Sequence, residues 1–318
     1  MNKTDRIYVA GHRGLVGAAI LRQLAAQGYI DLVLRERQEL DLTSQAAVDE
    51  FFRQTRPAYV FLAAAKVGGI AANSRYPADF IRDNLQIQTN VIDAAWRHGA
   101  RKLVFLGSSC IYPREAPQPM REDALLSGPL EPTNEWYAVA KIAGIKMCQA
   151  YRRQYGFNAI CLMPTNLYGP GDNFDLQNSH VLPALIRKFH EARLQGQASV
   201  TVWGSGQPRR EFLHVDDLAD AALFLARHYD DEAIINVGTG EDLTITELAQ
   251  QVARVVGFTG DIVYDRSRPD GTPRKLLDVR RLHALGWRHR IPLEAGIRQT
   301  YDWYREHAKD GSVRLASG

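Results

Sequence analysis

The sequence has few cysteines and no long apolar run. Its 318 residues include three cysteines, at positions 110, 148 and 161, and their spacing matches neither a metal motif nor a disulfide framework. The apolar run at 58–65 is far too short to cross a bilayer, and residues 1–6 lack the apolar stretch of a secretory signal. We therefore expect a cytoplasmic protein with no metal site and no membrane segment.

The charge of the chain is close to balanced. The formal net charge is +3, with acidic and basic residues interspersed. A nucleic-acid-binding protein usually gathers its basic residues into a stripe, and the sequence contains none, so we expect no nucleic-acid partner. With 45% hydrophobic residues, the chain is long enough for one large or two moderate domains with a proper core.

The chain opens with a glycine-rich turn between an apolar segment, residues 6–10, and a segment of helical periodicity, residues 15–27. A strand, a glycine turn and a helix form a dinucleotide-binding motif, in which the pyrophosphate lies at the helix N-terminus. The spacing G-x-x-G-x-x-G permits the tight turn and the approach of the pyrophosphate. We expect cofactor contacts from Gly11, His12, Arg13, Gly14, Leu15, Val16 and Gly17.

The end of the second predicted strand, residues 31–34, indicates which dinucleotide is bound. NAD enzymes place an acidic residue here for the ribose 2′-hydroxyl, but this chain has Arg35, Glu36 and Arg37. Guanidinium groups favour the additional 2′-phosphate of NADP, and we assign that contact to Arg13 and Arg37. Glu36 opposes this assignment, and a solvated charged loop explains Arg35 and Glu36 equally well.

A third motif combines Ser108, after the apolar segment 102–106, with Tyr137 and Lys141 in a helical segment at 136–155. Residues four apart share one face of a helix, and an ammonium beside a phenol is expected to lower the pKa of Tyr137 toward neutrality. With the Ser108 hydroxyl aimed at the same place, the three groups can move a proton to or from a carbonyl oxygen. The Tyr–Lys spacing by itself is also compatible with an exposed surface pair.

Together these motifs resemble the extended, sugar-nucleotide branch of the short-chain dehydrogenase/reductase superfamily. The resemblance implies an α/β fold, a Rossmann doubly wound parallel sheet with a smaller C-terminal α/β substrate domain. Residues 1–170, with segments at about 205–240 returning to them, would form the NADP-binding domain, and residues 171–318 mainly the substrate domain. It also implies a homodimer joined through helices at 79–96 and 136–155, and further cofactor contacts from Asp41, Leu106, Gly107, Ser108, Ser109, Lys141, Pro164, Thr165, Asn166, Leu167 and His180.

The segment 204–217 resembles the G-x-G-x-x-x-R-x-F-x-x-V-x-D signature of nucleotide-sugar enzymes. In that pattern the arginine, here Arg210, holds the diphosphate of the substrate. We expect further substrate contacts from Lys188, Trp203, Asp270 and Lys275. A buried structural role explains Trp203 equally well.

The residue two positions after Ser108 narrows the range of possible substrates. Nucleotide-sugar 4,6-dehydratases carry an Asp-Glu pair just after this serine, whereas this chain has Cys110, together with His180 at the end of an Asn-Ser-His run. This combination resembles the 3,5-epimerase-4-reductases that act on GDP-4-keto-6-deoxy-D-mannose with NADPH. The resemblance implies that Cys110 is the epimerising base and His180 the acid, with a protonated His180 also assisting the thiol. Without it, Cys110 is explained as a small buried apolar residue and His180 as a neighbour of a helix start.

In the reduction, the resemblance implies that Tyr137 protonates O4, that Ser108 helps to stabilise the enolate oxygen, and that Lys141 holds the nicotinamide ribose. Two alternatives remain. One is another nucleotide-sugar epimerase or reductase of the superfamily, such as a 4-epimerase with tightly held NAD, which Arg37 and Cys110 disfavour. The other is a non-catalytic NADP-sensing regulator, which typically lacks the Tyr or the Lys.

The arginine assignment predicts that Arg37→Ala weakens the preference for NADPH over NADH, because the variant loses a charge-assisted contact to the 2′-phosphate. One such contact contributes about 1.5–3 kcal/mol. The Michaelis constants for the two cofactors measure the preference, and Arg35→Ala is the matched control. An unchanged NADPH preference in Arg37→Ala would remove Arg37 from the cofactor site.

Overall fold

A six-stranded, wholly parallel sheet forms the centre of the larger part of the molecule. The computed structural model describes residues 1–176, 178–267, 270–309, 311 and 313. The strand order is β10-β5-β4-β3-β1-β2. The bounds are β1 Ile7–Ala10, β2 Leu32–Val33, β3 Tyr59–Leu62, β4 Lys102–Leu106, β5 Ala159–Pro164 and β10 Ile235–Val237. This arrangement confirms the expected α/β fold class, while the second strand is shorter than the predicted 31–34.

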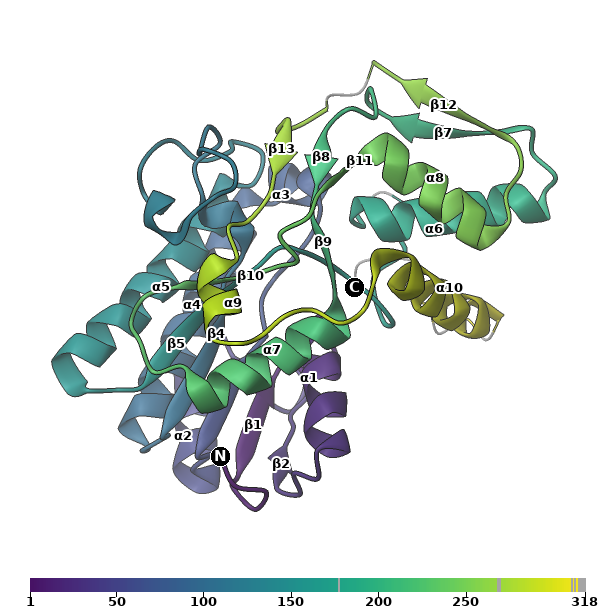
Figure 1. The fold of residues 1–318 in the computed structure, drawn as a ribbon. Helices are drawn as coiled ribbons and strands as arrows, with labels where there is room; N and C mark the ends of the chain where they lie inside the picture. The colour runs from purple at the N-terminus through teal and green to yellow at the C-terminus, as the bar shows by residue number, and fades with distance from the viewer. Residues whose placement is uncertain (177, 268–269, 310, 312, 314–318) are drawn as a thin grey trace.

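Helices cover both faces of this sheet, because its strands carry apolar side chains on both sides. Alternate residues of the strands pack into two separate cores, as expected for a parallel sheet buried on both faces. On one side lie α1 Leu15–Ala26 and α7 Val215–His228. On the other lie α2 Gln45–Thr55, α4 Pro77–Arg97 and α5 Glu135–Tyr155, and Figure 1 shows these layers.

The two long helices α4 and α5 pack against each other, and their contact needs a glycine. A Cβ added to Gly144 of α5 would lie 2.5 Å from Cζ of Phe105 and 2.8 Å from Oε1 of Gln88. The Gln88 side chain of α4 donates from Nε2 to the backbone oxygen of Ala140 at 2.6 Å. The helix that carries Tyr137 and Lys141 therefore lies close to both the sheet and α4.

Most of the remaining elements form a smaller unit beyond the carboxyl ends of the strands (Figure 1). It has its own apolar core, built mainly from α6 Val181–Leu194, α8 Ile245–Val256, α10 Leu293–Lys309 and the parallel strands β7 Ser199–Trp203 and β12 Asp261–Asp265. Strand β8 Arg209–Arg210 pairs with β11 Leu243–Thr244 and β13 Arg274–Lys275, and β6 Asn166–Tyr168 pairs with β9 Phe212–His214. The short helices are α3 Ile70–Arg75 and α9 Arg280–Ala284, with 3-10 turns at Ser109–Ile111 and Glu122–Ala124.

The chain passes between the two units several times. After β9, helix α7 packs on the sheet, and β10 forms its edge beside β5. Helix α9, which lies beyond the expected returning segment at 205–240, also packs next to β10. Within the part of the chain that the structure describes, no helix is both long and apolar enough to cross a membrane.

A fully buried carboxylate joins these passages. Glu211 is 0% exposed, and its side chain accepts hydrogen bonds from the backbone N–H groups of Thr239 at 2.6 Å, Gly240 at 2.8 Å and Leu277 at 3.0 Å. Burial raises the pKa of Glu211, and the backbone N–H groups oppose part of that rise. Its own carbonyl oxygen accepts from Nδ2 of Asn166 at 2.8 Å, so this residue links β6, β8 and the segments after β10 and β13.

Candidate active site

The glycine turn between β1 and α1 leaves room for a phosphate. A Cβ on Gly17 would lie 2.1 Å from the backbone oxygen of Gly11, so only glycine permits this close packing of helix on turn. Gly11 has φ +83°, in the left-handed region. No side chain caps the N-terminus of α1, and its first turn holds no acidic residue. Backbone N–H groups at a helix start bind phosphate, so this turn fits the pyrophosphate of a dinucleotide.

The two arginines assigned to the 2′-phosphate have different surroundings. Arg13 forms an ion pair with Glu36, with Nη1 and Oε2 2.5 Å apart. Glu36, the acidic residue that opposes the NADP assignment, is therefore a direct neighbour of Arg13, one of the two predicted ligands of the 2′-phosphate. Arg37 is exposed, whereas Arg35 lies over the ring of Phe51. A phosphate would have to compete with Glu36 for Arg13, which leaves Arg37 as the more accessible cation.

The other predicted cofactor residues lie mainly at the carboxyl ends of the strands, where open α/β sheets bind their ligands. Leu106 is the last residue of β4 and Gly107 follows it, whereas Pro164 is the last residue of β5 and residues 165–167 follow it. The N–H of Thr165 donates to the carbonyl of Val237 at 3.0 Å. Asp41, after β2, accepts hydrogen bonds from the backbone and hydroxyl of Thr43, which lower its pKa.

Lys141 is buried at the end of β4. Its ammonium donates to the carbonyl of Leu106 at 2.8 Å and lies 5.7 Å from the ring centroid of Tyr137. Burial lowers the pKa of Lys141 to about 8, although Cys148 and Cys161 raise it slightly. Because the amine can lose its proton near neutral pH, its charge depends on what binds beside it.

The expected lowering of the Tyr137 pKa is wrong for the ligand-free protein. Burial raises the pKa of Tyr137, and the nearby Cys110 raises it further. The spacing places Lys141 on the same helix face, but its ammonium is directed to the carbonyl of Leu106. The phenol is therefore held in its protonated form, which is the form that donates a proton or a hydrogen bond.

Ser108 and Cys110 lie in the turn that follows β4. Oγ of Ser108 accepts from the N–H of Cys110 at 3.2 Å, and the sulfur of Cys110 accepts from Nδ2 of Asn134 at 3.3 Å. Cys110 is partly exposed, which argues against a merely buried apolar role. The sequence analysis did not select Asn134, because the contact joins residues 24 positions apart and no local pattern indicates it.

His180 immediately precedes α6 and is exposed. The loop that carries it is attached to the loop after β3, since the N–H of Gly69 donates to the carbonyl of Asn178 at 3.2 Å. The protein surrounding the imidazole lowers the pKa of His180, and the cation of Lys275 lowers it further. The expectation of a protonated His180 is therefore not supported by its surroundings, and a bound anion near Lys275 would oppose this shift.

Lys188 and Trp203 form a pair in the smaller unit. The ammonium of Lys188 lies 4.8 Å from the ring centroid of Trp203 and donates to the carbonyl of Thr201 at 3.1 Å. Burial lowers the pKa of Lys188. Trp203 is 52% exposed, so the alternative of a buried structural tryptophan is wrong.

Arg210, Asp270 and Lys275 lie close together in the smaller unit. Asp270 accepts from the N–H and the hydroxyl of Ser205 at 2.6 and 2.7 Å, bonds that lower its pKa. Burial lowers the pKa of Arg210, with Asp270 acting in the opposite direction. Lys275 on β13 lines a small pocket together with Ser109 of the turn after β4, so the smaller unit reaches the catalytic turn.

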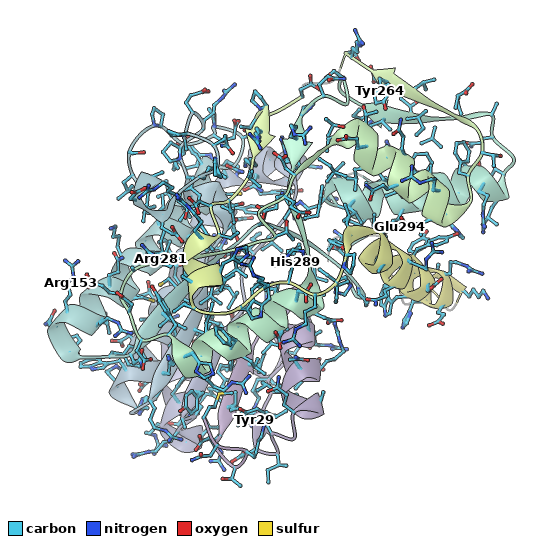
Figure 2. All side chains as sticks on the ribbon, viewed as in Figure 1. Tyr29, Arg153, Tyr264, Arg281, His289 and Glu294 are labelled. Carbon is cyan, nitrogen blue, oxygen red and sulfur yellow. The ribbon has the colours of Figure 1, made fainter. Side chains whose placement is uncertain are left out.

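Two further features of the molecule bear on the site. Among the described residues, no cluster of three or more His, Cys, Asp or Glu side chains is arranged to hold a metal ion. A separate hollow of about 370 Å³ lies between α7 and the chain before α10, where Figure 2 labels His289. Its lining includes Trp287 and Arg288 and none of the candidate site residues.

Known proteins resemble the whole chain. The model of the NAD dependent epimerase/dehydratase family matches residues 7–238. A probable GDP-L-fucose synthase 1 of Oryza sativa subsp. japonica is 63% identical, over 96% of this chain and 94% of that protein. A GDP-6-OMe-4-keto-L-xylo-heptose reductase from C. jejuni has a TM-score of 0.93 at 42% identity, covering 96% of this chain and 99% of that one. A GDP-L-fucose synthetase from Naegleria fowleri bound to NADP has a TM-score of 0.90 at 28% identity, covering 99% and 97%.

The buried Lys141 predicts a pH-dependent stability. Its folded-state pKa of about 8 is below the value of about 10.4 for an unfolded lysine, so between these values the unfolded chain binds more protons. Stability therefore rises with pH in this window, by up to about 1.4 kcal/mol per pH unit.

The measurement compares free energies of unfolding from pH 7 to 10.5. Relative to Lys141→Met, the wild type should gain stability as the pH rises through the window. Lys146→Met, on the exposed side of the same helix, should follow the wild-type curve. Parallel curves for wild type and Lys141→Met would contradict the assignment.

Proposed function

The chain belongs to the NAD dependent epimerase/dehydratase family, and we propose that it converts GDP-4-keto-6-deoxy-D-mannose into GDP-L-fucose with NADPH. The conversion comprises epimerisation at C3 and C5 and reduction at C4. Identity of 63% over nearly the whole length to a probable GDP-L-fucose synthase supports it. The observation that carries it is the position of Cys110 in the turn after β4, where its sulfur accepts a hydrogen bond from Asn134 at the start of α5, the helix that carries Tyr137, since reduction alone needs no second proton-transferring group.

NADPH supplies the hydride that reaches C4, and the protein supplies position and charge. The turn Gly11–Gly17 would hold the pyrophosphate, and Arg37, assisted by Arg13, the 2′-phosphate. The end of β4, residues 164–167 and Lys141 would hold the nicotinamide half. The expected contacts from Asp41 and His180 belong to this proposal too.

Epimerisation follows from the acidity of hydrogens next to a ketone. The C4 carbonyl of the substrate acidifies the hydrogens at C3 and C5, and Cys110 removes each in turn. The enolate oxygen accepts hydrogen bonds from Ser108 and from Tyr137, whose raised pKa keeps its proton in place. His180 returns a proton from the opposite face. Its lowered pKa means that it needs the negative charge of the bound substrate to be protonated.

Reduction uses the same oxygen. As hydride arrives at C4, Tyr137 gives its proton to O4. The ammonium of Lys141 lies 5.7 Å from the ring centroid of Tyr137, and it can turn from the carbonyl of Leu106 toward the phenolate once that charge has formed. One phenol therefore serves both half-reactions, first as a hydrogen-bond donor and then as an acid.

The nucleotide half of the substrate would lie in the smaller unit. Arg210 and Lys275 provide cations for the diphosphate. Arg210 lies beside Gly271, and Lys275 lines a pocket with Ser109, so the diphosphate would lie close to the reacting sugar. Trp203, with Lys188 over its ring, offers a flat apolar surface for the guanine base. Asp270 acts mainly through Ser205, which it holds by two hydrogen bonds.

A second candidate is reduction of another GDP-linked keto-sugar without epimerisation. The similarity to a GDP-6-OMe-4-keto-L-xylo-heptose reductase from C. jejuni favours it as the alternative. A non-catalytic NADP sensor is less well supported, because the chain keeps both Tyr137 and Lys141. Proton exchange at C3 and C5 separates the first two candidates, and NADPH oxidation separates both from the third.

The decisive assay offers the GDP- and dTDP-linked 4-keto-6-deoxy sugars side by side in D₂O. We expect NADPH oxidation with the GDP sugar and deuterium at both C3 and C5. Tyr137→Phe should lower the rate of hydride transfer by about 10²–10⁴-fold, because it removes one general acid. Oxidation of NADPH without deuterium at either carbon would favour the simple reductase.

Two variants assign the proton transfers in the same assay. Cys110→Ser should lose most exchange at both carbons while still binding NADPH, and His180→Asn should allow exchange but block net inversion. Cys148→Ser, a buried thiol on the far side of α5 from solvent, is the matched control. Exchange at the wild-type rate in Cys110→Ser would show that another group is the base.

We also propose a homodimer joined through α4 and α5, in a cytoplasmic setting that suits the three free thiols. Trp136, Val139 and Tyr155 of α5 are 42%, 39% and 44% exposed, and Tyr155 stacks on Trp96 of α4 with ring centroids 4.0 Å apart. Exposed apolar and aromatic side chains on a pair of packed helices are commonly buried in an interface. Light scattering should report twice the chain mass for the wild type and less for Val139→Glu, and a wild-type monomer would contradict the proposal.

A further inference from the structure

Asn134 occupies the N-cap position of α5 without forming the usual cap. An asparagine at this position normally accepts a hydrogen bond from the backbone N–H two or three residues later. Here the side chain makes no such bond, and its Nδ2 instead donates to the sulfur of Cys110 at 3.3 Å. The helix start therefore forgoes a stabilising interaction in favour of a contact with the thiol.

The same side chain leaves its other polar atom unsatisfied. Oδ1 of Asn134 is buried and has no hydrogen-bond partner among the described residues. Buried carbonyl oxygens without a partner are rare and costly, and they often mark functional sites. In this orientation the Asn134 side chain neither caps the helix nor has a partner for Oδ1. Its hydrogen bond to the Cys110 sulfur is the contact that it does make.

We propose that Asn134 is a positioning residue that aims the Cys110 sulfur at the substrate and stabilises its thiolate. A hydrogen bond donated to the charged form of a group favours that form, and the positive end of α5 adds to the effect. The backbone of Cys110 is fixed at its other side by Ser108. The inference rests on the proposed function only for the use of the thiolate as a base.

Other titratable groups lie near this turn. Tyr137 on α5 is close enough for Cys110 to raise the pKa of its phenol. The pocket beside Ser109 is lined by further charged side chains, which are Arg114, Glu131, Arg274 and Lys275. These groups are unchanged in variants of Asn134, so a change in thiol behaviour between wild type and variant reports on the amide.

The test measures the rate of alkylation by iodoacetamide against pH, because the thiolate is the reactive form. Cys148 and Cys161 are 0% and 2% exposed, so the folded protein should react at Cys110. In Asn134→Ala the half-maximal rate should move upward by about one pH unit, with alkylation near pH 7 slowed about tenfold. Asn90→Ala is the control, since it removes an amide that donates to the carbonyl of Leu42 instead.

Asn134→Asp is a second variant that keeps the inference testable if Asn134→Ala fails to fold. Aspartate keeps the shape and is a good N-cap, but it has no N–H to donate and its charge opposes the thiolate. Its alkylation profile should move upward at least as far as that of Asn134→Ala. Unchanged profiles in both variants would overturn the inference and leave Asn134 a structural residue.

Exchange of deuterium at C3 and C5 of the keto-sugar gives a second measurement. In Asn134→Ala it should fall with alkylation near pH 7 and approach the wild-type rate above pH 9, where the thiolate forms without help. Exchange that stays low at high pH would overturn the activation of the thiolate. If the wild type shows no exchange but the alkylation profile still moves, the proposed function fails and the Asn134 contact stands.

Discussion

The hydrogen bond from the Lys141 ammonium to the carbonyl of Leu106 determines where the catalytic helix lies. It ties the middle of α5 to the end of β4, inside a core that excludes water. From this position the first turn of the helix meets the turn after β4, so Asn134 donates a hydrogen bond to Cys110 and Tyr137 lies one turn further along the same helix. The absence of a side chain at Gly144 permits the close approach. A buried cation is costly, and this one is retained at the centre of the site.

The nucleotide-binding half of the site depends on a different buried charge. Glu211 gathers backbone N–H groups from segments that follow β10 and β13. Its neighbour Arg210 is thereby placed at the border of the two units, and Lys275 on β13 reaches the turn after β4. A carboxylate held by backbone groups therefore helps to set the position of Arg210 relative to the turn after β4.

The sequence predicted the fold class and the placement of Tyr137 and Lys141 on one helix face, because each depends on local spacing and on the order of elements. It mispredicted the pKa of Tyr137, since spacing shows which side chains share a helix face but not how far burial opposes the charged form. It could not decide whether Trp203 is a buried structural residue or an exposed one, which the structure settles in favour of exposure. No local sequence pattern could indicate the contacts of Asn134 and Glu211, because their partners come from distant segments of the chain. The predicted catalytic and binding roles stay proposals for experiment.

The order of the strands has a consequence for synthesis on the ribosome. Strand β5 is buried along its whole length, and its outer neighbour β10 comes from residues 235–237. A nascent chain that ends near residue 170 therefore presents β5 as an open sheet edge, a surface that invites pairing with other chains. Helix α7, which covers one face of the sheet, is missing at the same stage. The emerging protein must be shielded until much of the smaller unit has also been made, so the larger unit is not an independent folding segment.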